Sequence, residues 1–105
     1  MQESSIWVGQ GSVFIKENNQ SYQRASQGIN KIENESFFLS MRERSLAIWL
    51  YQGSLIRALG ENLFDITPNR ISIEKGALLA DNRTGRDMIF SAFAVDLEIS
   101  GKGVF

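Results

Sequence analysis

Few side chains in this sequence are suited to catalysis or to binding a metal ion. The 105 residues contain neither cysteine nor histidine. This removes thiol nucleophiles, disulfides, thiolate metal sites and the usual general base of nucleophilic catalysis. An enzyme with this composition would have to work with carboxylates, lysine or tyrosine alone. We therefore predict no catalytic residue, no metal site and no cofactor.

Two pairs of carboxylates have a spacing that could place them on one strand face. Glu33 with Glu35, and Asp96 with Glu98, lie two residues apart, which is the repeat of side chains along a strand. Paired carboxylates can hydrolyse glycosidic bonds. Nothing else in the sequence supports such a reaction, and acidic side chains at this spacing commonly keep a sheet edge soluble. We interpret both pairs in this second way.

A group of arginines and aromatic residues is the other candidate for chemistry. Trp49 and Tyr51 lie between Arg42, Arg44 and Arg57 in the sequence, an arrangement that a single-stranded nucleic acid could use for stacking on a Greek-key barrel. However, eleven Lys and Arg against twelve Asp and Glu give a net charge of −1, which offers no long-range attraction for a polyanion. We retain Trp49, Tyr51 and Arg57 as candidates for contact with a protein or glycan.

The elements that would position these residues contain an internal repeat. The segment that begins at Ile6 aligns without gaps on the segment that begins at Ile48, and residues 72–79 form a looser third copy. Each copy has an apolar stretch, a glycine and a second apolar stretch. Because glycine adopts positive φ without steric cost, the repeat predicts equivalent tight hairpin turns at its glycines. These turns fall at Gly11, Gly53 and Gly76.

The two tryptophans occupy the same column of this repeat. Trp7 aligns with Trp49, and a repeated position usually has a repeated packing role. We therefore expect both to be core residues that pack near each other. The alternative is that both contact a partner on one surface.

Strand signals run through the rest of the chain. Residues 46–51 and 88–99 show a period of two, the latter as one long strand with Ile89 on its apolar face. Pro68 marks a turn, and we interpret residues 21–36 as mostly extended or turn. The sequence predicts one all-β domain over residues 1–105, a small sandwich or irregular β-roll of short antiparallel strands.

The order of these units resembles the FecR-type β domain, a module on the periplasmic side of bacterial envelope signalling proteins. The Gly-Ser-Val of residues 11–13 matches its first strand, and residues 45–57 match its apolar strand, Gly-Ser turn and following strand. Residues 60–66, 74–79 and 94–101 resemble its continuation, second glycine turn and closing strand. Two departures are Gln52, where the family often has Asp, and Ser100-Gly101-Lys102, which replaces a closing Arg-Gly-Thr.

The resemblance implies a non-catalytic interaction or signalling module of the bacterial envelope, in the periplasm, that binds a protein or glycan. An exposed strand edge could pair with another chain, and the domain could also oligomerise. The longest apolar run, residues 46–51, is too short to span a membrane, and the sequence begins with no export signal. The alternative functions are a single-stranded nucleic-acid-binding barrel and a phage or virion structural subunit.

Overall fold

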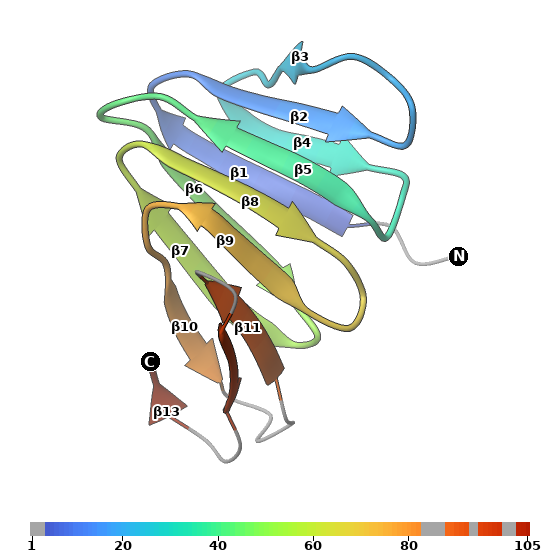
Figure 1. Cartoon of the computed structure of the whole chain (residues 1–105). Coiled ribbons are helices and arrows are strands. Elements are labelled where there is room, and N and C mark those ends of the chain that lie inside the picture. Colours follow the sequence, from blue (N-terminus) through green and yellow to red (C-terminus); the bar gives the residue numbers. More distant parts are fainter. Residues whose placement is uncertain (1–3, 83–87, 93–94, 100–102) are drawn as a thin grey trace.

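The computed structural model describes residues 4–82, 88–92, 95–99 and 103–105, except the side chains of residues 88, 95–97 and 99. Within these ranges the chain contains thirteen strands and no helix. The strands form two sheets that face each other (Figure 1). The predicted all-β fold class of short strands is thus confirmed.

The first sheet, called sheet A here, has its strands in the order β13-β10-β7-β6-β1-β4, and all of its strand pairs are antiparallel. The strands are β1 (Ser4–Gln10), β4 (Gly28–Ile32), β6 (Leu46–Tyr51), β7 (Ser54–Leu59), β10 (Leu79–Asn82) and β13 (Gly103–Val104).

The second sheet, sheet B, has the order β12-β11-β9-β8-β5-β2-β3, with one parallel pair, β9 with β11. The strands are β2 (Val13–Glu17), β3 (Gln23–Arg24), β5 (Phe37–Met41), β8 (Asn62–Ile66), β9 (Ile71–Lys75), β11 (Met88–Ala92) and β12 (Val95–Ile99). Residues 21–36 therefore contain β3, β4 and turns, as expected.

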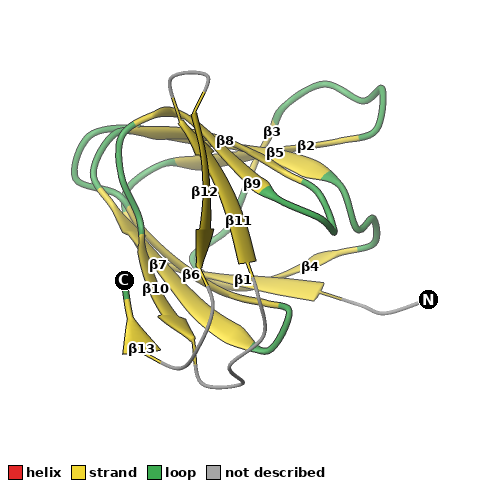
Figure 2. Ribbon diagram, turned by 60° about the horizontal axis from the view of Figure 1, so that its bottom comes forward, coloured by secondary structure: helices red, strands yellow, loops and turns green. Residues whose placement is uncertain are grey.

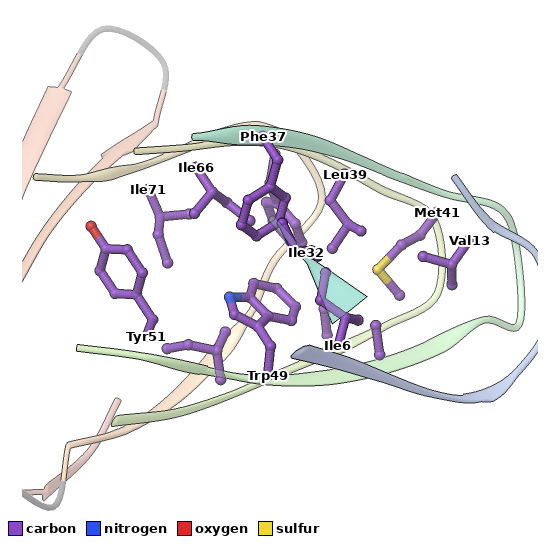
Figure 3. Close-up of a cluster of buried hydrophobic side chains, with 14 of the residues drawn as sticks. Ile6, Val13, Ile32, Phe37, Leu39, Met41, Trp49, Tyr51, Ile66 and Ile71 are labelled. Atoms are coloured by element: carbon purple, nitrogen blue, oxygen red, sulfur yellow. The ribbon is translucent and has the colours of Figure 1, made fainter. Parts of the chain in front are cut away.

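The hydrophobic core lies between the two sheets (Figure 2). Alternate residues of each strand point inward, because side chains repeat every two residues in a strand. Trp49 from sheet A meets Phe64 from sheet B with ring centroids 5.9 Å apart, and Ile6 and Leu39 are fully buried. Figure 3 shows how side chains from the two layers interdigitate. This burial is the main stabilising contribution to the fold.

The three glycines of the repeat all have positive φ but make different connections. Gly53, with φ of 80°, and Gln52, with φ of 52°, form the two-residue hairpin turn between β6 and β7. Gly11 lies where the chain passes from β1 in sheet A to β2 in sheet B, and Gly76 lies where it passes back from β9 to β10. The predicted equivalence of the three turns is therefore wrong, since two of them are crossings between sheets.

Both crossings pack against a buried polar residue. A side chain at Gly11 would collide with Ser45, and one at Gly76 would collide with the Asn62 side chain. The Ser45 hydroxyl accepts a hydrogen bond from the Ser12 amide at 2.9 Å. Asn62 Oδ1 accepts one from the Ala77 amide at 2.8 Å. Each crossing is thus held to the sheet through a close approach that only glycine allows.

The prediction for the two tryptophans is correct for Trp49 and wrong for Trp7. Trp49 is 3% exposed, whereas Trp7 is 43% exposed. The cause is register: β1 and β6 are neighbours, and Ile6 pairs with Trp49 while Trp7 pairs with Ile48. Side chains at paired positions share a face, so the two aligned tryptophans point to opposite faces of sheet A.

The single long strand predicted over residues 88–99 is replaced by two strands, β11 and β12, which pair antiparallel. Residues 93–94 between them lie outside the described part. Twelve extended residues would span roughly 40 Å, more than the longest dimension of the molecule, 34 Å. The prediction that Ile89 lies on the buried side of this segment is also wrong, because Phe90 is buried while Ile89 is only half-buried.

Candidate functional site

The structure separates the three residues predicted to contact a partner. Trp49 and Tyr51 are 3% and 6% exposed and belong to the core. Arg57 is exposed on the outer face of β7. These three side chains do not form one surface, because those of Trp49 and Tyr51 point into the sandwich and that of Arg57 points away from it.

Tyr51 and Trp49 line a cavity of about 190 Å³ at one end of the sandwich, together with Phe37 and Ile66 (Figure 3). The Tyr51 hydroxyl donates a 2.7 Å hydrogen bond to the carbonyl of Thr67. Burial raises the pKa of Tyr51 to about 12. The Trp49 indole Nε1 is buried and has no hydrogen-bond partner within the described residues. Tyr51 therefore has a structural role, in which it ties β6 to the turn after β8.

The predicted arginine platform is not assembled either. Arg42 lies over the ring of Phe14, 5.4 Å from its centroid, and Phe14 belongs to sheet B. Arg44 lies in the turn after β5, where its carbonyl accepts a hydrogen bond from Gln10 Nε2 at 2.8 Å. With Trp49 and Tyr51 buried, no aromatic ring between these arginines is available for stacking.

The carboxylate pairs also differ from the prediction. Glu33 and Glu35 follow β4 in a turn rather than sharing a strand face, and both are exposed. Glu98 lies on β12 and is exposed, while the Asp96 side chain lies outside the described residues. Among the residues described, no cluster of three Asp, Glu, His or Cys side chains could hold a metal ion.

The structure does gather one group of side chains that the sequence analysis did not single out. Six large apolar residues are exposed on the outer face of sheet A, one on each of its six described strands. We call this surface the apolar face. Its six members, from β4 to β13 across the sheet, are Ile29, Trp7, Leu50, Leu59, Leu79 and Val104.

The strand register places these residues in rows on a single face. One row crosses five strands through the printed pairs of the ladder. It consists of Ile29, Trp7, Ile48, Arg57 and Leu79. In the next row Leu50 pairs with Leu55, which pairs with Asp81, and Asp81 pairs with Val104. Because paired residues point the same way, the face is continuous.

The Trp7 ring packs against Gly9. A side chain at Gly9 would come within 2.7 Å of the Trp7 ring and 3.0 Å of Leu46. The absence of a Cβ at Gly9 leaves room for the indole ring to rest against β1.

The apolar face is as large as the patches that commonly have a function. Its members are between 42% and 75% exposed. With roughly 100–200 Å² for a fully exposed large apolar side chain, they expose on the order of 500 Å². The largest apolar patches on soluble monomers measure about 300–600 Å² and are commonly functional. The face therefore has the size of an interaction site.

The outer face of sheet B provides an internal contrast. Its aromatic residues Phe14 and Phe38 are half-buried, and each lies beneath a cationic side chain. Arg42 covers Phe14, and the Lys16 Nζ lies 5.5 Å from the centroid of Phe38. Long cationic side chains shield apolar surface with their methylene stems. The chain thus covers the outer aromatic residues of sheet B and leaves Trp7, the aromatic residue on the outer face of sheet A, exposed.

Comparison with known proteins adds no relative: no family model, no curated protein and no solved structure matches this chain. Across the described residues, no helix is long and apolar enough to cross a membrane.

A sequence signal for the apolar face did exist. Residues 46–51 of β6 are apolar without a break, and a strand that is apolar on both faces is typical of a sheet covered on both sides. In the structure Ala47, Trp49 and Tyr51 are buried while Leu50 is exposed. The alternation alone could not tell which set faces the core.

Proposed function

We propose that this chain is a non-catalytic interaction module that docks a protein through the apolar face. The supporting observation is the exposure of one large apolar residue on every described strand of sheet A, while the aromatics of sheet B are covered by cationic side chains. Burial of apolar surface is the main driving force of protein association. A sheet that is apolar on both faces gains that burial only when something packs against its outer side.

The chemistry of the face favours a protein over a glycan or a nucleic acid. Its charged side chains within the described residues are Lys31, Arg57 and Asp81. A sugar needs a set of converging polar groups, and a nucleic acid needs segregated cations. The face offers neither, whereas a protein surface with apolar side chains matches it.

The bacterial envelope, in the periplasm, remains the proposed location, and signalling the proposed setting. Both rest on the FecR-type pattern of residues 11–13, 45–57 and 74–79. Docking through a sheet face is compatible with this role, because a signalling domain needs a partner-binding surface and no catalytic group.

Site-specific photocrosslinking in the native host tests the docking. A photoreactive amino acid replaces Leu50, which is 65% exposed on the apolar face, or Tyr22, which is 42% exposed outside sheet A. We expect discrete crosslinked products from position 50, because a docked protein lies within reach of the probe.

Position 22 is the control for crosslinking that depends on exposure alone. Crosslinks from position 22 that match those from position 50 in pattern and yield would overturn the proposal. So would the absence of any product from position 50 when the protein is folded.

A further inference from the structure

We propose that the protein docked on the apolar face is a second copy of this chain, related by a two-fold axis parallel to the strands and midway between β6 and β7. This inference rests on the proposed function, which it narrows to one partner. It follows from the distribution of apolar and charged residues over sheet A.

The apolar residues are balanced about that midline. Strands β4, β1 and β6 lie on one side and β7, β10 and β13 on the other, and each carries one large exposed apolar residue. A two-fold axis along the midline places each strand opposite a strand of the second copy: β6 opposite β7, β1 opposite β10, and β4 opposite β13. Trp7 then faces the second copy's Leu79, and Val104, which is in the row of Asp81, lies opposite the second copy's Lys31. The contacts of Trp7 with Leu79 and of Leu50 with Leu55 are apolar and are each made twice, while Arg57 of each copy lies beside the axis, opposite the second copy's Ile48.

The shape of the face suits this arrangement. Sheets pack face to face about 10 Å apart when both surfaces are broad and apolar. The Trp7 ring rests against Gly9 and is less exposed, at 43%, than Ile29, Leu50 or Leu59.

The area is that of a stable dimer. A standard interface buries about 800 Å² on each partner, of which about 56–65% is apolar. The face exposes on the order of 500 Å² of apolar surface, which is the apolar share expected of such an interface. The half-buried Leu46, Ile48 and Leu55 lie between its members and would complete the contact.

The charges at the rim are complementary under the same axis. Lys31 of β4 pairs with Ser5 of β1. Ser5 in turn lies beside Leu50 of β6. The same row continues through Leu55 of β7 to Asp81 of β10. Lys31 and Asp81 therefore lie in one row on opposite sides of the midline. The two-fold places Lys31 across the interface from the second copy's Asp81, with a sideways offset of one strand spacing, about 4.8 Å. Two such pairs form, one at each end of the row.

A charge exchange tests this geometry. Lys31→Asp leaves two acidic residues at each rim contact, and Asp81→Lys leaves two basic ones. Each variant alone should dimerise roughly tenfold more weakly than the wild type, because like charges face each other. An equimolar mixture should dimerise as well as the wild type, because the carboxylate introduced at position 31 of one variant then faces the ammonium group introduced at position 81 of the other. Sedimentation velocity over a concentration series measures all three.

Leu59→Glu tests the apolar part of the interface, with Gln23→Glu as the control that adds the same charge on β3 of sheet B. We expect Leu59→Glu to raise the dissociation constant of the dimer at least about 30-fold, the effect of losing one interface hot spot. Gln23→Glu should leave it unchanged. Circular dichroism verifies that each variant is folded, and a variant that is not folded is replaced by Leu50→Glu.

A wild-type chain that stays monomeric at a few hundred micromolar would overturn the second copy as partner. So would a mixture of the charge variants that remains as weak as its components. The proposed function has a different test from the dimer. Photocrosslinks from position 50 to a different protein would support docking on the apolar face without a second copy. The absence of any specific product from position 50 would overturn the docking itself.

Discussion

At the scale of single residues, the fold depends on a few polar side chains that fix the crossings between its sheets. Asn62 is buried and bonds both neighbouring loops: its Nδ2 donates to the carbonyl of Leu59 at 3.1 Å, and its Oδ1 accepts from Ala77. Buried polar groups are costly unless they are hydrogen-bonded. The close approach of Gly76 is what allows Asn62 to make both bonds.

Gly76→Ala should therefore destabilise the fold more than Gly60→Ala. Both glycines have positive φ, 94° and 89°, so both substitutions carry a backbone strain of about 1–2 kcal/mol. A methyl group at Gly76 also collides with Asn62, whereas one at Gly60 meets nothing within 4 Å. We expect Gly76→Ala to cost at least about 2 kcal/mol more in unfolding free energy, measured by urea denaturation, because it breaks a buried hydrogen bond. An equal decrease in unfolding free energy for Gly76→Ala and Gly60→Ala would contradict the role given to Asn62.

Tyr51 makes the stability of the fold sensitive to alkali. Burial raises its pKa from 10.0 to about 12 in the folded chain. The unfolded state therefore loses this proton first, and the stabilising contribution of Tyr51 is complete below pH 10 and disappears as the pH rises to about 12. Tyr51→Phe lacks this contribution and loses its bond to Thr67, at a cost of about 1–2 kcal/mol at pH 7.

The measurement is the unfolding free energy of both proteins between pH 8 and 12, from urea titrations. The difference between wild type and Tyr51→Phe should be constant up to pH 10 and shrink above it. A difference that stays constant to pH 12 would show that Tyr51 titrates normally in the folded chain.

At the scale of elements, periodicity indicated strands and could not assign their faces. Trp7 of β1 aligns with Trp49 of β6 in the repeat but pairs in the ladder with Ile48, and an offset of one residue places a side chain on the opposite face. Both faces of these strands are apolar, so the hydrophobic pattern did not identify the inward set. The same ambiguity hid the apolar face and left Trp49 and Tyr51 as candidates for contact with a partner.

The glycines illustrate what local sequence could and could not predict. Positive φ at Gly11, Gly53 and Gly76 follows from the properties of glycine itself and was foreseen. Whether a turn closes a hairpin or crosses to the other sheet depends on long-range pairing, such as that of β2 with β5. No feature within the repeat contains that information.

Gly9→Ala should displace Trp7 from the surface of β1. The new methyl group would lie 2.7 Å from the ring, so the indole must swing outward. In a Leu59→Glu background, which keeps the face uncovered, acrylamide should quench the tryptophan fluorescence more strongly in Gly9→Ala than in its parent. Because Trp49 is 3% exposed, the change reports Trp7. Unchanged quenching would mean that the ring does not rest on Gly9.

At the scale of the whole molecule, the two sheets are alike inside and different outside. Both contribute alternate side chains to one core, but only the aromatics of sheet B are covered by cationic residues of the same chain. Composition predicted one core, and the glycine turns and the period of two predicted the fold class. These features could not predict the asymmetry between the outer faces, because that depends on which strands share a sheet.

Hydroxyl-radical footprinting of Trp7 and Tyr22 in the native host tests the central claim, that the apolar face is covered by a protein, most directly. The two side chains are 43% and 42% exposed in the isolated chain, so each serves as a reference for the other once normalised to the unfolded protein. We predict that Trp7 is protected several-fold relative to Tyr22, and that the two become equal in purified Leu59→Glu. Equal labelling of Trp7 and Tyr22 in the native host would show that nothing docks on the apolar face.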